Sequence, residues 1–493
     1  MKHPSLALAV LGLSLLAGPQ ARATTAASAG DQALADFLAA GDQPAAARRI
    51  EAVVTSGLAF DEVLAGLRRG RDYAAKVGRG AQQGRNGDHS YAYVVPDSYD
   101  PARAYAVRVQ LHGGVGRQQP PDVSRLGVGR LPGTVEEIQV FPAAWANSLW
   151  WQASQVDSLS RILDKLKRTY NVDENRVYLT GISDGGTGVY FMAFRDTTPW
   201  AGFLPLNGNM MVLATPEVGA DGLMFPGNAV NKPFFVVNGA RDPLYPAQPE
   251  ERASFESFVD DHPRDPLPDK LTWETERVDR YNRAHWLVID RLGSSPGDAA
   301  LADSNLLHRG KQYDFGLRIA PNVERGRRVG DVSADSNAVR IGLRRGDLIL
   351  EVDGRRVQDA RELLERMQQW ELGSTIRLVV DRAGQRQALE GRFQPADVEA
   401  PAEPIFPRGR PSGRVDLVRH GNVVDASTQG VHAFTLLLSP STFDFWQPVR
   451  VVANGRTVFD GKVGPSVATL LKWAARDNDR TMLFGVELAI ELP

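Results

Sequence analysis

The chain has 493 residues, of which 43% are apolar and 24% are charged, and its formal net charge is −2. This near balance of interspersed charges gives no electrostatic footprint for nucleic acid or for anionic lipid. The sequence contains no cysteine, which excludes disulfides, thiolate metal sites and a cysteine nucleophile. We expect neither a metal nor a cofactor, and the length predicts several domains.

The first 23 residues have the pattern of a secretory signal peptide. Lys2 provides a positive start, residues 5–17 are an apolar run, and Ala21-Arg22-Ala23 is a small-x-small cleavage site. This run is too short to span a bilayer, and no later stretch approaches about eighteen uninterrupted apolar residues. We therefore expect a periplasmic or secreted chain with no transmembrane helix in its mature form.

The next two segments differ in texture. Residues 24–82 are rich in Ala, Leu, Arg and Glu at helical spacing, which predicts a small helical lead-in. Residues 83–280 alternate apolar runs with amphipathic stretches, which predicts an α/β domain with a mostly parallel sheet covered on both faces. The strand-like runs are YAYVVP, YAVRVQLHGG, EIQVFP, RVYLTGIS, FLPLNG and FFVVNG, and Val156, Leu159, Leu163, Leu166 and Tyr170 keep a helical period between the third and fourth.

Two linkers divide the remainder of the chain. Residues 281–311 contain a short strand and then a Gly- and Ser-containing linker, and residues 395–413 are rich in proline. They bracket a self-contained segment, residues 312–394. Residues 414–493 are expected to form a small β-rich domain.

The C-terminal segment also predicts a particular pairing of strands. Its Asn454-Gly455 suits a type I′ hairpin turn. The run HWLVID precedes the first linker, and one short strand left alone would have an unpaired edge. We therefore predict that residues 284–290 join the sheet of the C-terminal domain, which would make residues 312–394 an insertion.

The stretch LTGISDGGTG contains Gly-x-Ser-x-Gly between an apolar run and an expected helix. This is the strand-turn-helix context of a nucleophile elbow, with Ser183 at the turn. Gly181 and Gly185 would relieve the crowding of so tight a turn. The backbone N–H of Asp184, at the start of the helix, would point toward an oxyanion.

Further features follow in the order that a catalytic triad requires. Gly113 and Gly114 end a strand in LHGGVG and could supply the second oxyanion donor, and Asp242 ends a later strand in FFVVNGARDPLYP. With these motifs, residues 90–280 resemble secreted α/β-hydrolases of the polyhydroxyalkanoate-depolymerase and feruloyl-esterase kind. The resemblance implies a doubly wound sheet, a Ser183 nucleophile and an Asp242 acid.

The histidine base is harder to place, because the Gly-His pair usual in those relatives is absent after Asp242. A serine hydroxyl needs such a base to become nucleophilic. His285 follows a strand-like run and has the required order, although it also begins the strand HWLVID. His262 resembles a helix C-cap, and His308 and His432 are expected to be structural.

Two other groups of residues lie in the same region of the sequence. His112 is next to the expected oxyanion loop but precedes Ser183, so we expect it to orient that loop. Trp145, Trp150 and Trp151 could form an apolar or carbohydrate-stacking wall over the site, and packing in the core is an equally open reading.

Residues 312–394 resemble a bacterial PDZ domain of the type attached to periplasmic proteases. The turn and strand positions of that family are occupied by Gly342-Leu343, Gly346-Asp347, Ile349 and Asp353-Gly354. The resemblance implies capture of an extended peptide by its C-terminal carboxylate. The peptide-binding residues implied are Phe315, Gly316, Leu317, Arg318 and Ile319, with Val357 and Leu363 completing the pocket.

These features predict an exported serine hydrolase that acts on an ester, with Ser183, Asp242 and His285 as its triad and a PDZ module for a protein C-terminus. Two alternatives remain open. One is a peptidase of the same fold, because the order of Ser, Asp and His serves esters and peptides alike. The other is a hydrolase scaffold that has lost its base and acts as a binding protein.

Overall fold

The structure is a computed structural model of the 493-residue chain. It describes residues 28–73, 78, 80–126, 136–238, 262–294, 306–307, 315–320, 324–367, 369–371, 373–394 and 403–492. The expected signal peptide, residues 1–23, and Asp242 lie outside these ranges. Within them, no helix is long and apolar enough to cross a membrane.

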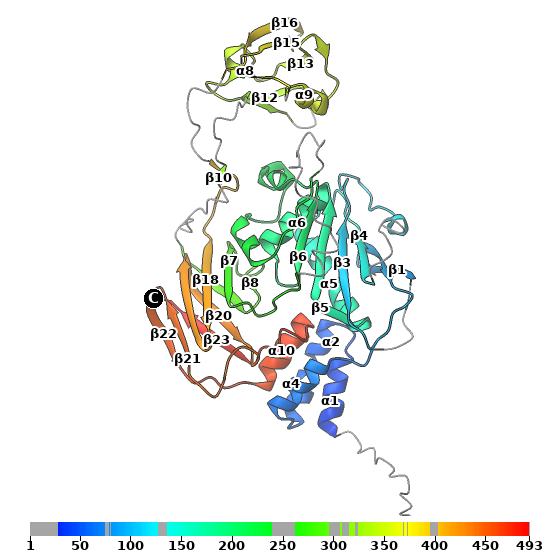
Figure 1. Ribbon diagram of the computed structural model, residues 1–493, viewed down its shortest axis with the longest axis vertical. Coiled ribbons are helices and arrows are strands. Elements are labelled where there is room, and N and C mark those ends of the chain that lie inside the picture. The colour runs from blue at the N-terminus through cyan, green and yellow to red at the C-terminus, as the bar shows by residue number, and fades with distance from the viewer. Residues whose placement is uncertain are drawn as a thin grey trace, which may run out of the picture.

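Four short helices open the described chain: α1 (Ala29–Leu38), α2 (Gln43–Ala47), α3 (Ile50–Thr55) and α4 (Phe60–Arg69). Ser28 and Asp42 cap two of them by accepting hydrogen bonds from backbone N–H groups. Their apolar faces pack against α10 (Val467–Asp477) near the other end of the chain, where Leu470 and Leu471 are fully buried (Figure 1). The expected lead-in is therefore helical, and a C-terminal helix completes its core.

The central domain contains a six-stranded mixed sheet in the order β1-β2-β4-β3-β5-β6. Strands β4, β3, β5 and β6 are parallel, whereas β1 and β2 pair antiparallel with each other and β2 with β4. Isolated parallel bridges add residues 234 and 237 beside β6. The strands are β1 (Gly80–Asn86), β2 (His89–Val95), β3 (Tyr105–Leu111), β4 (Ile138–Pro142), β5 (Val172–Ile182) and β6 (Gly202–Leu206).

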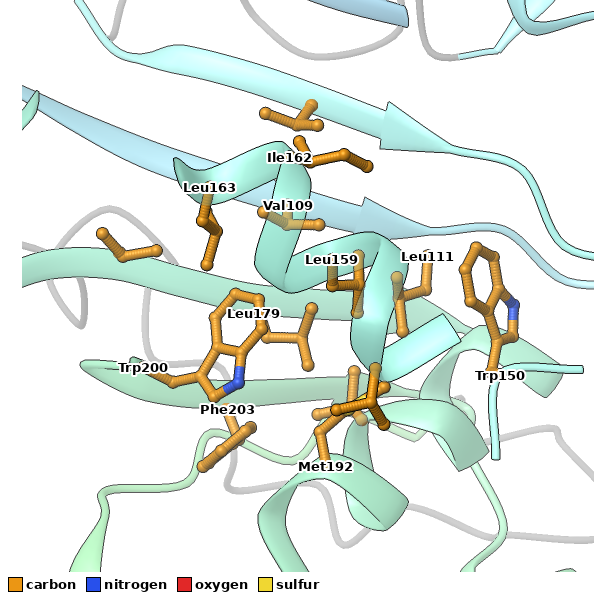
Figure 2. Close-up of a cluster of buried hydrophobic side chains, with 14 of the residues drawn as sticks. Val109, Leu111, Trp150, Leu159, Ile162, Leu163, Leu179, Met192, Trp200 and Phe203 are labelled. Atoms are coloured by element: carbon orange, nitrogen blue, oxygen red, sulfur yellow. The ribbon is translucent and has the colours of Figure 1, made fainter. Parts of the chain in front are cut away.

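Helix α5 (Ala153–Thr169) joins β4 to β5, and α6 (Asp184–Arg195) follows β5. Figure 2 shows Leu159 and Leu163 of α5 over Val109 and Leu179 of the sheet, all of them buried. Burial of each such side chain stabilises the fold by about 1.5–3 kcal/mol. Short 3₁₀ turns complete the domain: η1 (Val123–Arg125), η2 (Met210–Ala214), η3 (Pro216–Val218) and η4 (Pro226–Asn231).

Two sheets pack face to face in the C-terminal domain and share one apolar core. The first has the order β22-β21-β19-β18-β7 and the second β23-β20-β9-β8. The strands are β7 (Lys270–Thr275), β8 (Arg283–Ala284), β9 (Leu287–Leu292), β18 (Gly413–His420), β19 (Val423–Gln429), β20 (Val431–Leu438), β21 (Val449–Ala453), β22 (Arg456–Gly461) and β23 (Val486–Glu491). Asn454 and Gly455 have φ of 49° and 77°, as the predicted turn between β21 and β22 requires.

The pairing of β9 with β20 confirms the prediction that residues 284–290 join the C-terminal sheet. Strand β7 differs from expectation. It lies within residues 83–280, which were expected to form the hydrolase domain, but it pairs with β18 (Figure 1). The reason is that Leu271 and Trp273 alternate toward the apolar core between the two C-terminal sheets.

The intervening segment forms a separate domain with its own apolar core. Its two ends are held together, because β10 (Leu306–Leu307) and β17 (Glu403–Pro404) pair antiparallel. The segment is therefore an insertion between β9 and β18. Its elements are β11 (Leu317–Ile319), η6 (Glu324–Gly326), β12 (Val329–Val332), α8 (Asn337–Arg340), β13 (Leu348–Val352), β14 (Arg355–Arg356), α9 (Ala360–Met367), β15 (Thr375–Arg382) and β16 (Gln385–Arg392).

Buried ion pairs connect the central and C-terminal domains. Arg264 donates to Asp479 at 2.6 Å, both side chains are fully buried, and Lys167 of α5 lies 3.8 Å from the same carboxylate. Burial alone would raise the pKa of Asp479, but the charges of Arg264 and Lys167 hold it below its usual value. The Asp479 carboxylate therefore remains ionised between these two cations.

Loss of one partner of this pair should destabilise the protein strongly. We expect Arg264→Met to lower the stability by about 3–5 kcal/mol, because it leaves the Asp479 carboxylate buried with reduced compensation. The matched control is Arg103→Met, whose partner Glu136 is exposed and whose loss should have little effect on stability, because solvent screens the pair. Urea unfolding of both variants measures the difference, and equal losses would contradict the importance of the buried pair.

Candidate active site

Ser183 occupies the turn between β5 and α6, in an unusual backbone conformation. Its φ of 56° and ψ of −122° lie in a region that side-chain-bearing residues seldom adopt, at a cost of order 1–3 kcal/mol. The turn is held by hydrogen bonds from the Ser183 N–H to the Leu206 carbonyl and from the Thr187 N–H to the Ser183 carbonyl, both 3.0 Å. The Ser183 side chain is exposed at the carboxyl edge of the sheet.

Glycines make this turn sterically possible. A Cβ on Gly181 would lie 2.3 Å from the Gly185 carbonyl oxygen, and one on Gly185 would lie 2.1 Å from that of Leu111. A Cβ on Gly186 would lie 2.7 Å from the Cα of Gly208. The backbone of the turn therefore touches β3 and the end of β6 at distances that only glycine allows.

The loop after β3 lies directly against Ser183. A Cβ on Gly113 would be 3.0 Å from the Ser183 Cβ and 3.5 Å from its Oγ, and Gly114 has a φ of 69°. The N–H of Asp184 belongs to the first turn of α6, where backbone donors have no partner within the helix. The structure thus brings Gly113, Gly114 and Asp184 together around the serine.

The Asp184 side chain has a role that the sequence did not indicate. Its Oδ2 accepts a hydrogen bond from the Val115 N–H at 3.0 Å, which ties the loop after β3 to the start of α6. Only the backbone of Asp184 was predicted to contribute. The sequence signal for this hydrogen bond is an acidic residue within Gly-x-Ser-x-Gly, together with a glycine-rich loop that the fold brings beside it.

His112 orients the same loop, as predicted. Its ring is neutral, since Nδ1 donates to the Gly113 carbonyl at 2.8 Å and Nε2 accepts from the Ala144 N–H at 3.0 Å. Burial lowers the pKa of His112, which favours this uncharged form. Trp150 Nε1 donates to the His112 carbonyl at 2.8 Å. With both ring nitrogens engaged, His112 is a positioning residue for the loop.

The three tryptophans after β4 belong to the core. Trp150 is fully buried, and Trp145 and Trp151 are 8% and 5% exposed. Packing, rather than a wall over the site, is therefore their role. Ile182 differs, since it is 48% exposed immediately before Ser183. It gives the surface beside the serine an apolar rim that the sequence analysis missed.

His285 does not lie near Ser183, which corrects its predicted role as catalytic base. It follows β8 in the C-terminal domain, where its N–H donates to Thr198 Oγ1 and its Nδ1 donates to the Pro266 carbonyl. Thr198 precedes the amino end of β6, whereas Ser183 follows the carboxyl end of the parallel strand β5. The five residues of β6 alone separate these edges by about 16 Å.

The surroundings of His285 suit a structural role. Its ring is buried, and burial with the nearby charges of Lys232 and Arg264 holds its pKa well below the usual value. His262 is also near the amino edge, because its carbonyl accepts from Tyr178 Oη. His432 is exposed on β20, and His308 lies outside the described residues. Among the described histidines, none hydrogen-bonds Ser183.

The segment that carries Asp242 begins at the correct edge. Asn207 donates its N–H to the Val237 carbonyl at 2.7 Å, so residues 234–237 run parallel beside β6. Their carboxyl end points to the same edge as Ser183, and Asp242 follows outside the described residues. In the part of the chain that the structure describes, no three acidic or histidine side chains form a group suited to a metal ion.

The predicted peptide-binding loop of the inserted domain makes close contacts with the rest of that domain. Gly316 has a φ of 79°, and a Cβ there would lie 2.1 Å from the Ser336 Cβ. Phe315 is buried against Trp370, with their rings 4.9 Å apart. Leu317 and Ile319 are half-buried on β11, Arg318 is exposed, and Val357 and Leu363 lie in the core.

Comparisons with known proteins identify the family of the inserted domain. Residues 314–390 match the family model of the PDZ domain, so the insertion is a PDZ domain. A bifunctional acetylxylan esterase/xylanase of Neocallimastix patriciarum is 31% identical over 74 residues, and the match spans 14% of this chain and 11% of that protein. The chain thus spans about a tenth of the length of this curated relative.

Solved structures overlap parts of the chain. A thermostable esterase has 23% identity and a TM-score of 0.27, over 34% of this chain and 48% of its own. An HtrA-type protease, AlgW, with a decapeptide has 25% identity and a TM-score of 0.16, over 16% of this chain and 28% of its own.

Substitution of Gly185 distinguishes the effect of a steric clash from the general effect of replacing a glycine. We expect Gly185→Ala to lower the melting temperature, because the new methyl group meets the Leu111 carbonyl although alanine otherwise favours a helix. Gly116→Ala, in the neighbouring loop, is the control, since its Cβ would meet nothing within 4 Å. Calorimetry of both variants provides the measurement, and an unchanged or higher melting temperature for Gly185→Ala would contradict the close approach.

Proposed function

We propose that the chain is an exported serine hydrolase that acts on carboxylic esters and uses Ser183 as its nucleophile. The observation that carries this proposal is the strained conformation of Ser183 at the end of β5, surrounded by glycines. Strain of this kind persists where the surrounding structure enforces it, and it clusters at functional sites. The expected signal peptide supports a periplasmic or secreted location.

In the proposed reaction, Ser183 Oγ attacks the ester carbonyl and forms an acyl-enzyme with loss of the alcohol. The N–H groups of Asp184 and of the Gly113-Gly114 loop would stabilise the negative charge on the carbonyl oxygen. The tie between Asp184 Oδ2 and the Val115 N–H and the hydrogen bonds of His112 hold this loop in place before substrate arrives. Ile182 would contact an apolar part of the ester.

In the hydrolase proposal, a histidine base for Ser183 would come from outside the described residues. Six of the eight histidines are described, and none of them hydrogen-bonds Ser183. The remaining two are His3, in the expected signal peptide, and His308. We therefore assign the acid to Asp242 and the base to His308, which replaces the earlier assignment to His285.

No described histidine hydrogen-bonds Ser183, and this observation also favours a second candidate. That candidate is a binding protein built on a hydrolase scaffold without a working base. An unactivated serine hydroxyl reacts poorly with phosphonylating reagents, because it is a weak nucleophile at its ordinary pKa. Reactivity of Ser183 therefore distinguishes the two candidates.

Labelling with a fluorophosphonate probe tests the hydrolase directly. We expect the wild-type chain to be labelled, and Ser183→Ala to lose labelling and at least about 1000-fold of its turnover of p-nitrophenyl acetate, because the covalent path is removed. Asp242→Asn and His308→Gln should give losses of similar size, whereas His285→Gln should keep labelling at neutral pH wherever it remains folded. Absence of labelling in the folded wild type would favour the binding protein.

We also propose that the PDZ domain binds peptides through a free C-terminus. The supporting features are the left-handed Gly316 and the half-buried Leu317 and Ile319 on β11, a strand that pairs with β12 on one side. The ester substrate and the peptide would then occupy different domains.

Fluorescence polarisation with the full chain measures this binding. A peptide that ends in a free apolar residue should bind, and its C-terminally amidated form should bind at least about tenfold more weakly, because the charged carboxylate accepts stronger hydrogen bonds. Gly316→Ala should weaken the free peptide to a similar extent. Equal affinity for the free and amidated peptides would rule out carboxylate capture.

A further inference from the structure

A cavity of about 810 Å³ lies between the central and C-terminal domains, away from Ser183. Its walls come from α5, from the residues between α6 and β6, from residues 279–283 and from α10, and residues 42–44 of the N-terminal helices complete them. Trp200 and Thr198 line it and precede β6, so the cavity is at the amino edge of the central sheet. Ser183 is at the opposite edge.

The charges around this cavity are numerous but balanced. Seven acidic and seven basic side chains line it. Most are already paired: Arg283 with Asp477 at 2.6 Å, Arg280 with Asp157, and Arg264 with Asp479 at 2.6 Å. Because the lining carries no net charge, the cavity does not favour a ligand with a large net charge of either sign.

Several polar groups of the lining have no such partner among the described residues. Asp196, which caps the C-terminus of α6, makes no side-chain hydrogen bond. The Arg476 guanidinium lies over the Trp473 ring at 5.0 Å and forms no ion pair. Trp200 Nε1 has no hydrogen-bond acceptor either, but it is buried with almost no accessible surface. The cavity thus presents one strong acceptor, Asp196, and one accessible donor, Arg476.

Burial makes the Asp196 carboxylate receptive to a ligand. It raises the pKa of Asp196 to about 6, although the positive charges of Arg280, Arg283 and Arg476 oppose the shift. At neutral pH the half-buried carboxylate is therefore mostly ionised. The Arg476 side chain, whose pKa is lowered by desolvation and by the positive charge of Arg283, is exposed to the cavity and to solvent. Hydrogen bonds from a ligand would replace the part of the hydration that the Asp196 carboxylate lacks.

We propose that this cavity binds an uncharged polyhydroxylated ligand of disaccharide size, such as a short sugar. Hydroxyl groups both donate and accept hydrogen bonds, so one ligand can donate to Asp196 and accept from Arg476. A neutral ligand preserves the balance of charge in the lining. The volume of the cavity lies within the range of small-molecule sites, which is roughly 300–1,000 Å³.

Because the cavity lies between domains, a bound ligand would change how strongly these domains associate. Asp196 and Trp200 belong to the central domain, whereas Arg476 lies on α10, which packs against the N-terminal helices and the C-terminal sheets. A ligand that contacts both would stabilise their association and raise the melting temperature according to its affinity.

Calorimetric titration of the full-length Ser183→Ala variant, which removes the proposed nucleophile and hence turnover, tests the site independently of the hydrolase proposal. Cellobiose, maltose and xylobiose are the sugar probes, and L-arginine, L-glutamate and sulfate are the charged probes. We expect at least one disaccharide to bind and to raise the melting temperature. Asp196→Ala and Arg476→Gln should each weaken it about tenfold, the effect of one lost hydrogen bond to a charged group.

The control is Asp61→Ala, which removes an exposed aspartate on α4 and should leave affinity unchanged. The Arg476 side chain is exposed, so Arg476→Gln keeps the test valid if Asp196→Ala fails to fold. Three results would overturn the proposal: no disaccharide binds at tens of millimolar, binding is unaffected by either cavity substitution, or a charged probe alone binds in a manner that depends on Asp196.

Discussion

Strands β7 and β9 can bury their apolar faces only by pairing with β18 and β20, which follow them in the chain after the whole PDZ domain. This non-local pairing requires the two ends of the PDZ domain to lie side by side. The antiparallel pairing of β10 with β17 meets this requirement, because these two strands flank the PDZ domain. It also commits residues 270–292 to the C-terminal domain. The architecture of the chain follows from this one constraint, since an unpaired edge at β7 or β9 would leave backbone groups and apolar side chains exposed.

The pairing of β7 and β9 with the C-terminal strands also gives the two edges of the central sheet different surroundings. At the amino edge, Arg264 reaches Asp479 and the backbone N–H of His285 reaches Thr198. These contacts, with the ion pair between Arg480 and Glu174, attach the C-terminal domain to that edge. Arg280 adds a hydrogen bond to the Ala153 carbonyl at the start of α5, which follows the carboxyl end of β4. Ser183 takes part in none of these contacts, so the buried ion pairs of the amino edge lie away from it.

Local patterns in the sequence predicted the elements well, because each depends on neighbours a few residues away. The glycines around Ser183, the apolar period of α5 and the Asn454-Gly455 turn are of this kind. The placement of β7 and His285 was not predictable in the same way. It depends on partners more than 100 residues distant, as in the pairing of Trp273 with Val415. The cavity around Asp196 could not be predicted from the sequence for the same reason, since its walls come from distant parts of the chain.

Many charged groups at the junction of the domains are paired at short range, as Arg283 is with Asp477, although the buried Lys232 forms no ion pair with a described residue. Two deviations lie at the sites proposed above: the strained backbone of Ser183, and the Asp196 carboxylate, which accepts no hydrogen bond from a described residue. Both deviations cost free energy, and each is held in place by rigid neighbours: the glycines beneath Ser183, and the paired arginines around Asp196. Local strain that rigid neighbours maintain clusters at functional sites.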